Sequence, residues 1–309
     1  MTSQAQGVLF VGALTLDTLY SVDSFSEGPG KYLSQQSMSM ASGMATNAAF
    51  AAVKLSGKAA LWASVGSDLR AAALISDIEA DGIDCSYVRH VEGGQSANAI
   101  IVVDKEGERW VVVDYDPLTQ APPERDELPP IDQFRAVMAD VRWPGAAKMA
   151  LEKARESGRY AILDADVAEP EVLKELSASA THVVASASGA EILCDVTNPI
   201  EAASTIAHQY QCFVCVTCGG QGTYWTSPDH AEVRHTPAPK VDVVDTNGAG
   251  DVFHGAFALA MAEGKSEQTS IQFASCAAAL KCTVLGGRLG APSRAETLQL
   301  LMEFYNEQY

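Results

Sequence analysis

The feature that most constrains the fold of this chain is a regular alternation of apolar strands and amphipathic helices in its second half. Strand patterns lie at residues 136–141, 160–166, 181–186 and 213–218, and helical patterns at 145–158, 170–179 and 199–210. Strands joined by helices in this rhythm form a parallel sheet with right-handed crossovers and helices on both faces. The expected fold class is therefore α/β, with a doubly wound, mostly parallel sheet.

Two stretches depart from this rhythm, at about residues 13–40 and 97–114. Their alternating polar and apolar residues, interrupted by glycine and proline, are typical of half-exposed strands joined by turns. An Ala-rich helical pattern follows the first stretch and ends at Gly57. We expect the two stretches to form a small β-sheet lid on a single domain that spans residues 1–309.

The charge balance narrows the classes of partner. The 309 residues include 21 Lys and Arg against 39 Asp and Glu, which gives a net charge of −18. Nucleic-acid and anionic membrane surfaces attract clusters of Lys and Arg, so neither partner is expected. No apolar run approaches the roughly 20 residues of a membrane span, and the first residues lack the pattern of a secretory signal. We expect a cytoplasmic enzyme.

Three of the seven cysteines are spaced in a way that suggests a metal site. Cys212, Cys215 and Cys218 follow one another at intervals of three residues. They occupy an apolar strand pattern, where residues three apart point to opposite faces and cysteine behaves as a small hydrophobic residue. A packing role is favoured over zinc binding, because no companion cluster of Cys or His is visible.

The segment from Asp245 to Asp251, with the sequence DTNGAGD, is the strongest candidate for chemistry. Gly248 and Gly250 allow close backbone approach, and the helix pattern that follows offers unpaired amides at its positive end. Such a site suits an anion. Asp251 can then act as a base for a hydroxyl that attacks a phosphate. The alternative is that Asp251 only caps the helix.

This segment resembles the C-terminal signature of the ribokinase-like (PfkB) family of sugar and nucleoside kinases, and the resemblance extends along nearly the whole chain. It implies that Asp251 is the catalytic base and that the amides of residues 248–250, Gly248, Ala249 and Gly250, form the anion hole. The segment at Gly43 is similar to the family's paired-glycine segment, with Ser42 at the other glycine. Asp17 and Asn47 match positions that bind sugar hydroxyls.

The resemblance also implies ATP and Mg²⁺ as cofactors. Three residues, Thr217, Gly219 and Gly222, lie in a stretch that resembles the nucleotide-binding loop, and Asp245 and Thr246 are assigned to the same role. The usual Asn-x-x-Glu motif, which organises water around magnesium, is replaced by Ser186 and Gly189, so Glu191 or the nucleotide phosphates must compensate. Gly286 and Gly287 are candidates to hold a monovalent cation such as K⁺ through their carbonyl groups.

Within the family, several segments are similar to bacterial sulfofructose kinases and fructokinase-like members. Lys31 and Arg142 match positions that hold the sulfonate, whereas Asp114 stands where those enzymes have asparagine. A carboxylate there repels a sulfonate and favours a neutral sugar such as fructose.

The resulting hypothesis is an ATP-dependent kinase that phosphorylates a primary hydroxyl of a ketohexose-type sugar, fructose-like or sulfofructose. A nucleoside kinase of the same fold and a non-catalytic sugar-binding regulator are the alternatives. Exposed edges of the lid strands indicate a homodimer formed through the lid. His254 and Trp143 are the other residues considered for a place near the site. A packing or solvent-facing role is favoured for His254, whereas Trp143, beside Arg142, is the one tryptophan expected near the substrate.

Overall fold

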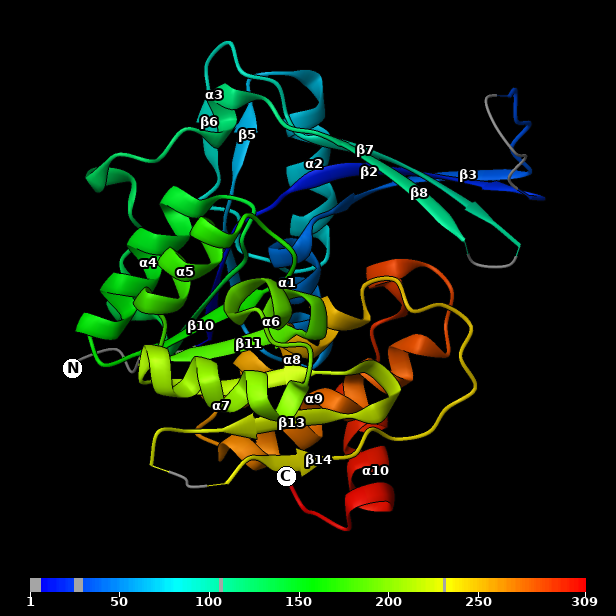
Figure 1. The fold of residues 1–309 in the computed structure, drawn as a ribbon. Helices are drawn as coiled ribbons and strands as arrows, with labels where there is room; N and C mark the ends of the chain where they lie inside the picture. The colour runs from blue at the N-terminus through cyan, green and yellow to red at the C-terminus, as the bar shows by residue number, and fades with distance from the viewer. Residues whose placement is uncertain (1–6, 25–29, 106–107, 230–231) are drawn as a thin grey trace.

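A computed structural model describes residues 7–24, 30–105, 108–229 and 232–309 of the chain (Figure 1). Its larger sheet has eight strands in the order β14-β13-β12-β11-β10-β9-β1-β4. These are β1 (Val8–Val11), β4 (Ala59–Trp62), β9 (Ala136–Ala139), β10 (Tyr160–Ala165), β11 (His182–Ser186), β12 (Phe213–Thr217), β13 (Thr223–Thr226) and β14 (Arg234–Thr236). The strands from β4 to β12 are parallel, and β13 and β14 are antiparallel additions at one edge.

Helices cover both faces of this sheet, and the strand alternation explains how. Val8 and Phe10 belong to one buried cluster, whereas Leu9 and Val11 of the same strand belong to the other. The first cluster includes residues of α1 (Met44–Lys54), α8 (Ala249–Ala262) and α9 (Glu267–Cys282), against which α10 (Arg294–Tyr305) packs. The second includes residues of α4 (Pro144–Glu156), α5 (Pro170–Ser179), α6 (Ala187–Cys194) and α7 (Pro199–Tyr210). The predicted α/β fold class is confirmed.

A second sheet has the four strands β3-β2-β7-β8 and extends from the body as a curved arm (Figure 1). Its strands are β2 (Thr15–Val22), β3 (Gln36–Ser42), β7 (Asn98–Asp104) and β8 (Arg109–Asp114). They lie within or next to the predicted ranges 13–40 and 97–114, of which residues 25–29 and 106–107 lie outside the described chain. We call this sheet the lid.

The remaining elements lie near the base of the lid. Helix α2 (Leu69–Ala80) contacts β2 and β3, and a short parallel pair joins β5 (Ser64–Gly66) to β6 (Arg89–Val91). A single turn of helix, α3 (Pro117–Gln120), follows β8. No helix in the described parts of the chain is long and apolar enough to cross a membrane.

Candidate active site beneath the lid

A hydrogen bond from Asn47 to Asp251 links the segment that follows Gly43 to the Asp245–Asp251 segment. Asn47 Nδ2 donates to Asp251 Oδ2 at 2.7 Å, although the two residues are 204 positions apart. The contact depends on tight packing of α1 against α8, because a Cβ atom at Gly255 would overlap the carbonyl oxygen of Ala48. Small residues in both helices therefore bring the predicted sugar-binding amide to the predicted base.

The start of α1 is fixed by a buried carboxylate that the sequence analysis did not identify. Asp140, just after β9, accepts hydrogen bonds from the amides of Ala13 and Ala45, each at 2.9 Å, and from that of Arg142 at 2.8 Å. Burial raises the pKa of Asp140, against the effect of these amides. Gly43 precedes the helix with φ of 114°, a conformation that favours glycine. This explains why glycine is kept there.

Hydrogen bonds connect Asp17, on lid strand β2, through Ser42 and Asn47 to Asp251, the predicted catalytic base. Thr15 Oγ1 donates to Asp17 Oδ1 at 2.7 Å, and Ser42 Oγ donates to Asn47 Oδ1 at 3.4 Å. Burial raises the pKa of Asp17, while hydrogen bonds from Thr15 and Ser42 oppose the rise. The structure thus brings Asp17, Asn47 and Asp251 together, and gives Ser42, which replaces the family's second glycine, a role in orienting Asn47.

The surroundings of Asp251 suit a base that works near neutral pH. Burial, together with the negative charge of Asp164, raises the pKa of Asp251 to about 7, while the hydrogen bond from Asn47 opposes the rise. A general base is most effective when its pKa lies near the working pH. The environment therefore favours proton transfer over a simple capping role.

His254, one turn along α8, is a buried part of this site. Its Nδ1 lies 2.7 Å from the carbonyl oxygen of Gly250, and its Nε2 lies 3.2 Å from that of Val184 and 3.3 Å from Asp164 Oδ1. Burial lowers the pKa of His254 and raises that of Asp164 well above its usual range. Through its contact with the Gly250 carbonyl, His254 holds the first turn of α8.

The loop before α8 has a geometry that suits the predicted anion site. Gly248 has φ of 75° and precedes the helix, and the Ala249 amide donates to the Thr246 carbonyl at 3.2 Å. The amides of Gly250 and Asp251 fall in the first turn, where no carbonyl lies one turn earlier to accept them. A Cβ atom at Gly250 would meet nothing within 4 Å. The space beside Gly250 is therefore open, whereas the Ala249 amide is already bonded.

A cavity of about 610 Å³ reaches from this loop toward β12 and α9. Its lining includes the predicted nucleotide-binding residues Thr217, Gly219, Gly222 and Thr246, but Asp245 is not among the lining residues. The other lining residues are mostly small or apolar: Gly220, Thr223, Ala238, Pro239, Lys240, Val241, Val243, Ala249, Gly250, Phe253, Ser275, Ala278, Ala279 and Cys282. An apolar cavity that ends at first-turn amides suits a nucleotide, with its base in the cavity and its phosphates at α8.

Asp245 instead organises the loop from beneath. Its Oδ1 accepts the Asn247 amide at 2.8 Å, and its Oδ2 accepts Lys281 Nζ at 2.9 Å and the amides of Gly286 and Gly287 at 3.0 and 3.2 Å. Partial burial opposes ionisation of Asp245, but these hydrogen bonds outweigh it and lower its pKa. Gly286 and Gly287 thus present amides to Asp245, where the resemblance implied carbonyl ligands for a cation.

The altered magnesium motif has a physical explanation. Ser186 Oγ donates to Asp166 Oδ1 at 2.8 Å and accepts the Gly189 amide at 3.0 Å. A side chain at Gly189 would overlap the carbonyl oxygen of Ala165, so a glutamate has no room there. Glu191 lies on the exposed side of α6. The described residues contain no group of three or more His, Cys, Asp or Glu arranged to hold a metal. The half-buried carboxylate of Asp166 fits a magnesium ion whose other ligands are nucleotide phosphates and water.

The three residues aligned with a sulfonate site are not brought together. In the lid sheet, Asp114 of β8 pairs with Asn98 of β7, and Asp17 of β2 pairs with Ala99, the next residue of β7. Because neighbouring residues of a strand point to opposite faces, Asp114 and Asp17 lie on opposite faces of the lid. Asp114 is exposed and accepts a hydrogen bond from Asn98 Nδ2 at 3.4 Å. Lys31 is exposed in the connection between β2 and β3, at the far end of the lid. The arrangement does not support the hypothesis that Asp114 faces the sugar.

Arg142, by contrast, lies beside the site. Its positive charge lowers the pKa of Asp140, Asp164 and Tyr115 against the stronger effect of burial. It forms no ion pair with a carboxylate in the described part of the chain, and it is half-buried. An anionic group on a ligand could therefore reach it.

Two other expectations concerned packing. Cys212 and Cys215 are buried in or next to β12, where burial raises the pKa of Cys212 to about 12, and the described residues contain no metal cluster at Cys218. Trp143 is also buried, in edge contact with Trp62 at 5.4 Å between ring centroids. The packing interpretation fits the cysteines, and the expected place of Trp143 near the substrate stays a prediction.

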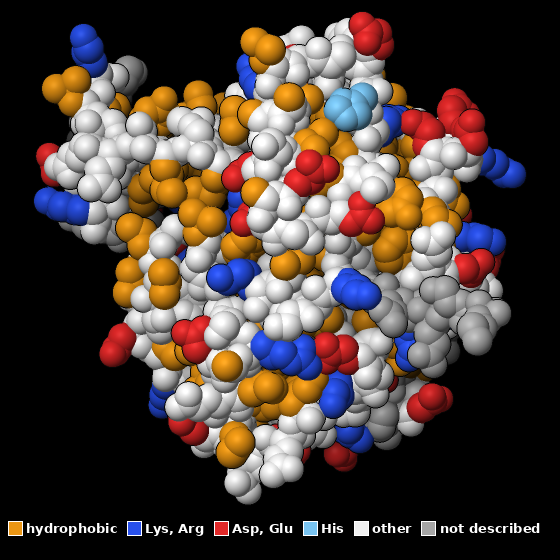
Figure 2. Space-filling model, turned by 180° about the vertical axis from the view of Figure 1, so that it is seen from behind, with side chains coloured by type: hydrophobic (Ala, Val, Ile, Leu, Met, Phe, Trp, Pro, Cys, Tyr) orange, Lys and Arg blue, Asp and Glu red, His pale blue; other side chains and the backbone are white. Residues whose placement is uncertain are grey.

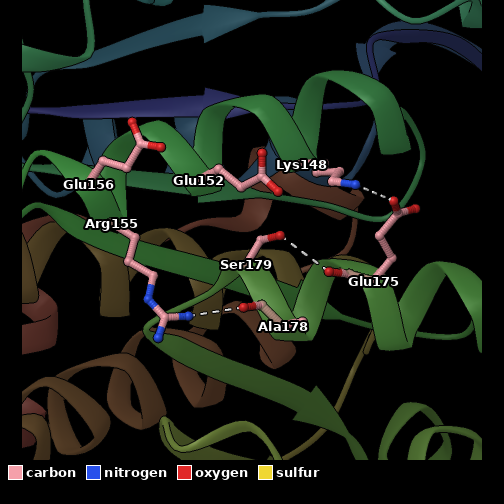
Figure 3. Close-up of a pocket in the computed structure, with 7 residues that line it drawn as sticks. All are labelled: Lys148, Glu152, Arg155, Glu156, Glu175, Ala178 and Ser179. Atoms are coloured by element: carbon pink, nitrogen blue, oxygen red, sulfur yellow. Dashed lines mark hydrogen bonds and ion pairs between the residues drawn. The ribbon is translucent and has the colours of Figure 1, made fainter.

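A second hollow, of about 520 Å³, lies between α4 and α5 (Figure 3). Lys148 Nζ pairs with Glu175 Oε1 across it at 2.6 Å, and Arg155 Nη1 donates to the Ala178 carbonyl at 3.0 Å. All the residues that line it belong to these two helices. It contains no residue that the sequence analysis selected.

Sequence reasoning missed Asp140, Asp164, Asp166 and Lys281. The first three carry a recognisable signal, because each lies at the carboxyl end of a strand pattern, where α/β sheets bind ligands. Lys281 carries no such signal, since a lysine in the last turn of a helix is usually exposed and only complements the dipole.

Comparison with known proteins agrees with the site. Residues 5–294 match the pfkB family carbohydrate kinase. The ribokinase of Haemophilus influenzae is 27% identical over 302 residues, which cover 94% of this chain and 97% of that protein. A crystal structure from Agrobacterium tumefaciens, provisionally described as a ribokinase, is 40% identical with a TM-score of 0.94 and covers 98% of this chain and 100% of its own.

Two more distant structures share the fold. Arabidopsis thaliana ribokinase complexed with ribose and ATP has a TM-score of 0.83 at 23% identity, covering 96% of this chain and 99% of its own. Burkholderia thailandensis nucleoside kinase in complex with inosine has a TM-score of 0.78 at 22% identity, covering 97% and 98%. With the family match across most of the sequence, the predicted class of enzyme is confirmed: the chain belongs to the pfkB family of carbohydrate kinases, which are phosphotransferases that act on sugars.

Proposed function

We propose that this protein transfers the γ-phosphoryl group of ATP to a primary hydroxyl of a ketohexose-type sugar. The observation that carries the proposal is the 2.7 Å hydrogen bond between Asn47 and Asp251. It supports a site in which Asn47 binds the sugar and Asp251, in the first turn of α8, acts as the base. The chain would work as a single kinase domain in the cytoplasm, where ATP is available.

In this mechanism the sugar lies between the lid and the body. Asp17 accepts hydrogen bonds from the sugar hydroxyl groups, and the Asn47 amide can both donate and accept, so together they orient the sugar. Asp251 removes the proton of the primary hydroxyl as that oxygen bonds to the γ-phosphorus and the bond to ADP breaks. ADP leaves with the bridging oxygen, and the proton stays on Asp251 until solvent removes it.

ATP would occupy the 610 Å³ cavity, with its base against Val243 and Ala278 and its phosphates at the amides of Gly250 and Asp251. These amides stabilise charge on the transferring group, since they are already oriented before the reaction. Magnesium bound to the phosphates would neutralise part of their charge, and Asp166, oriented by Ser186, is the carboxylate placed to hold its water shell.

Sulfofructose is a second candidate substrate, favoured by one observation. Arg142 is half-buried, lies beside the site and pairs with no carboxylate in the described chain. Since Asp114 points to the other face of the lid, the repulsion that favoured a neutral sugar does not apply. A sulfonate would give Arg142 a charge-assisted partner.

Two alternatives make different demands on the site. A nucleoside kinase needs a flat apolar surface for the base on the sugar side, where this chain has Arg142 and Asp17. A non-catalytic regulator has no need for a base whose pKa is raised to about 7.

We also propose a homodimer formed through the lid. The lid exposes apolar side chains, including Ile100 (47%), Trp110 (53%) and Val112 (67%). Figure 2 shows hydrophobic side chains gathered where the arm joins the body. Burying them against a second copy would remove this surface from water.

The test is a coupled ADP-release assay over fructose, sulfofructose, ribose and inosine. We expect the highest kcat/KM with a ketohexose. Arg142→Ala should reduce turnover of sulfofructose by about tenfold more than that of fructose, because a charge-assisted bond is lost only with the former. Turnover of inosine or ribose alone would reject the substrate class, and turnover of no substrate would support the regulator.

A further inference from the structure

The most unusual charged residue in the molecule is Lys281, which is completely buried in the last turn of α9 (0% exposed). A lysine is almost never fully buried unless it is paired. Its ammonium group lies directly beneath the loop that carries the anion hole. We therefore ask which groups compensate the buried positive charge of Lys281.

Three oxygen atoms surround the Lys281 ammonium. Nζ donates to the Asp245 carbonyl at 2.8 Å, to Asp245 Oδ2 at 2.9 Å and to the Val284 carbonyl at 3.4 Å. An ammonium has three N–H donors and no acceptor, so the number of oxygens matches the number of donors. Gly290 closes the site, because a Cβ there would lie 3.1 Å from the Val284 carbonyl oxygen and 3.4 Å from Lys281 Cε.

Carbonyl and carboxylate oxygens from two loops are also the ligands that replace the water shell of a potassium ion. A free cation does not fit with Lys281 in place, because the ammonium already occupies the point where these oxygens converge. The Gly286 carbonyl, one of the expected ligands, accepts the Leu289 amide at 3.1 Å. The residues present thus do not fit a resident monovalent cation at this place.

We infer that the Lys281 side chain is a built-in substitute for a monovalent cation, which makes this kinase independent of potassium. Its charge fixes Asp245, and Asp245 in turn holds the Asn247 amide at 2.8 Å and so sets the turn that leads to Gly248. Lys281 is a positioning residue: it acts on the transferring phosphoryl group through Asp245 and the loop, without touching it.

The experiment compares the full-length wild type with Lys281→Ala and Lys281→Met in potassium chloride and in tetramethylammonium chloride at equal ionic strength. The kinase readout rests on the proposed phosphoryl transfer, whereas the second readout, the melting temperature, needs no substrate. Lys281→Ala empties a space lined by the three oxygens. Lys281→Met removes the charge but fills the space, and Lys148→Ala, on the far surface, controls for loss of a lysine.

We expect wild-type activity to be the same within about twofold in the two salts. Lys281→Ala should lose about tenfold or more of kcat/KM in tetramethylammonium and regain most of it in potassium, with a potassium-specific rise in melting temperature. Lys281→Met should respond to neither salt. A potassium-dependent melting temperature without kinase activity would support the inference and count against the proposed function alone.

Two results would overturn the inference. The first is a wild type that is several-fold more active in potassium, which would place a cation site elsewhere. The second is a Lys281→Ala variant whose activity and melting temperature are the same in both salts. Should that variant fold in neither salt, the wild-type comparison decides by itself.

Discussion

Asp251 must be ionised to accept a proton, and its surroundings oppose that charge. Burial and the nearby Asp164 raise the pKa of Asp251 to about 7. Because only the ionised form acts as a base, kcat/KM should increase with pH along a limb centred near 7 and level off above it. A pH–rate profile with saturating ATP measures this limb. A profile that stays flat from pH 5 to 8 would contradict it.

Replacing the base tests the same residue without changing its shape. Asp251→Asn keeps the size of the side chain but cannot accept the proton, so kcat should decrease by about 10²–10⁴-fold with ATP binding retained. Asp132→Asn, on the exposed surface, is the matched control. Near-normal turnover in Asp251→Asn would support the alternative that Asp251 only caps the helix.

The same substitution also has a predictable effect on stability. Since the pKa of Asp251 is higher in the folded protein than its usual 3.8, the folded state loses stability as pH rises from about 4 to about 7. Removing the carboxylate removes this cost. Asp251→Asn should therefore melt at a higher temperature than wild type at pH 8, and the difference should shrink toward pH 4.

At the scale of elements, the anion site depends on the first turn of α8 staying open. A side chain at Gly250 has free space in the protein without ligands, so Gly250→Val should fold and keep its melting temperature within a few degrees. The added methyl groups would occupy the space of the transferring phosphoryl group, and activity should be lost. Full activity in the folded variant would show that the phosphoryl group does not approach these amides.

A hydrogen bond links the lid to the same loop. Arg109 Nη1, at the start of β8, donates to Asn247 Oδ1 at 3.2 Å. If this bond helps to hold the lid closed over the sugar, Arg109→Ala should raise KM for the sugar a few-fold and increase the ratio of idle ATP hydrolysis to sugar phosphorylation. Arg125→Ala, outside the lid, is the control. An unchanged ratio would separate this contact from lid closure.

Whether a residue's place could be predicted depended on whether it follows from local pattern or from packing between elements. The strand and helix rhythm is local, and it predicted the α/β sheet. The Asp245–Asp251 segment is also local, and the family that it resembles implied a place for Asn47 near Asp251. The face on which Asp114 lies depends on the register of β8 against β7, where a shift of one residue reverses every side chain. Burial of Lys281 depends on how α9 meets the Asp245 loop, which no periodicity reveals.

At the scale of the whole molecule, the exposed apolar surface of the lid bears on the proposed homodimer. All six residues of β8 are exposed, and β8 is an edge strand of the lid sheet. Such an edge is usually covered or charged, because it can pair with another chain. A second copy packed against the lid would cover it, and would also hold the arm in place above the sugar.

Charging this surface tests the dimer. The double substitution of Trp110→Lys and Val112→Lys places two positive charges on one face of β8, because residues two apart share a face. A dimer that buries this face should dissociate, so light scattering after size exclusion should give the mass of one chain in place of two. KM for the sugar should rise while the melting temperature of the body changes little. Leu69→Lys, an exposed apolar residue on α2, is the matched control, and a variant that keeps the wild-type mass would rule out this face as the interface.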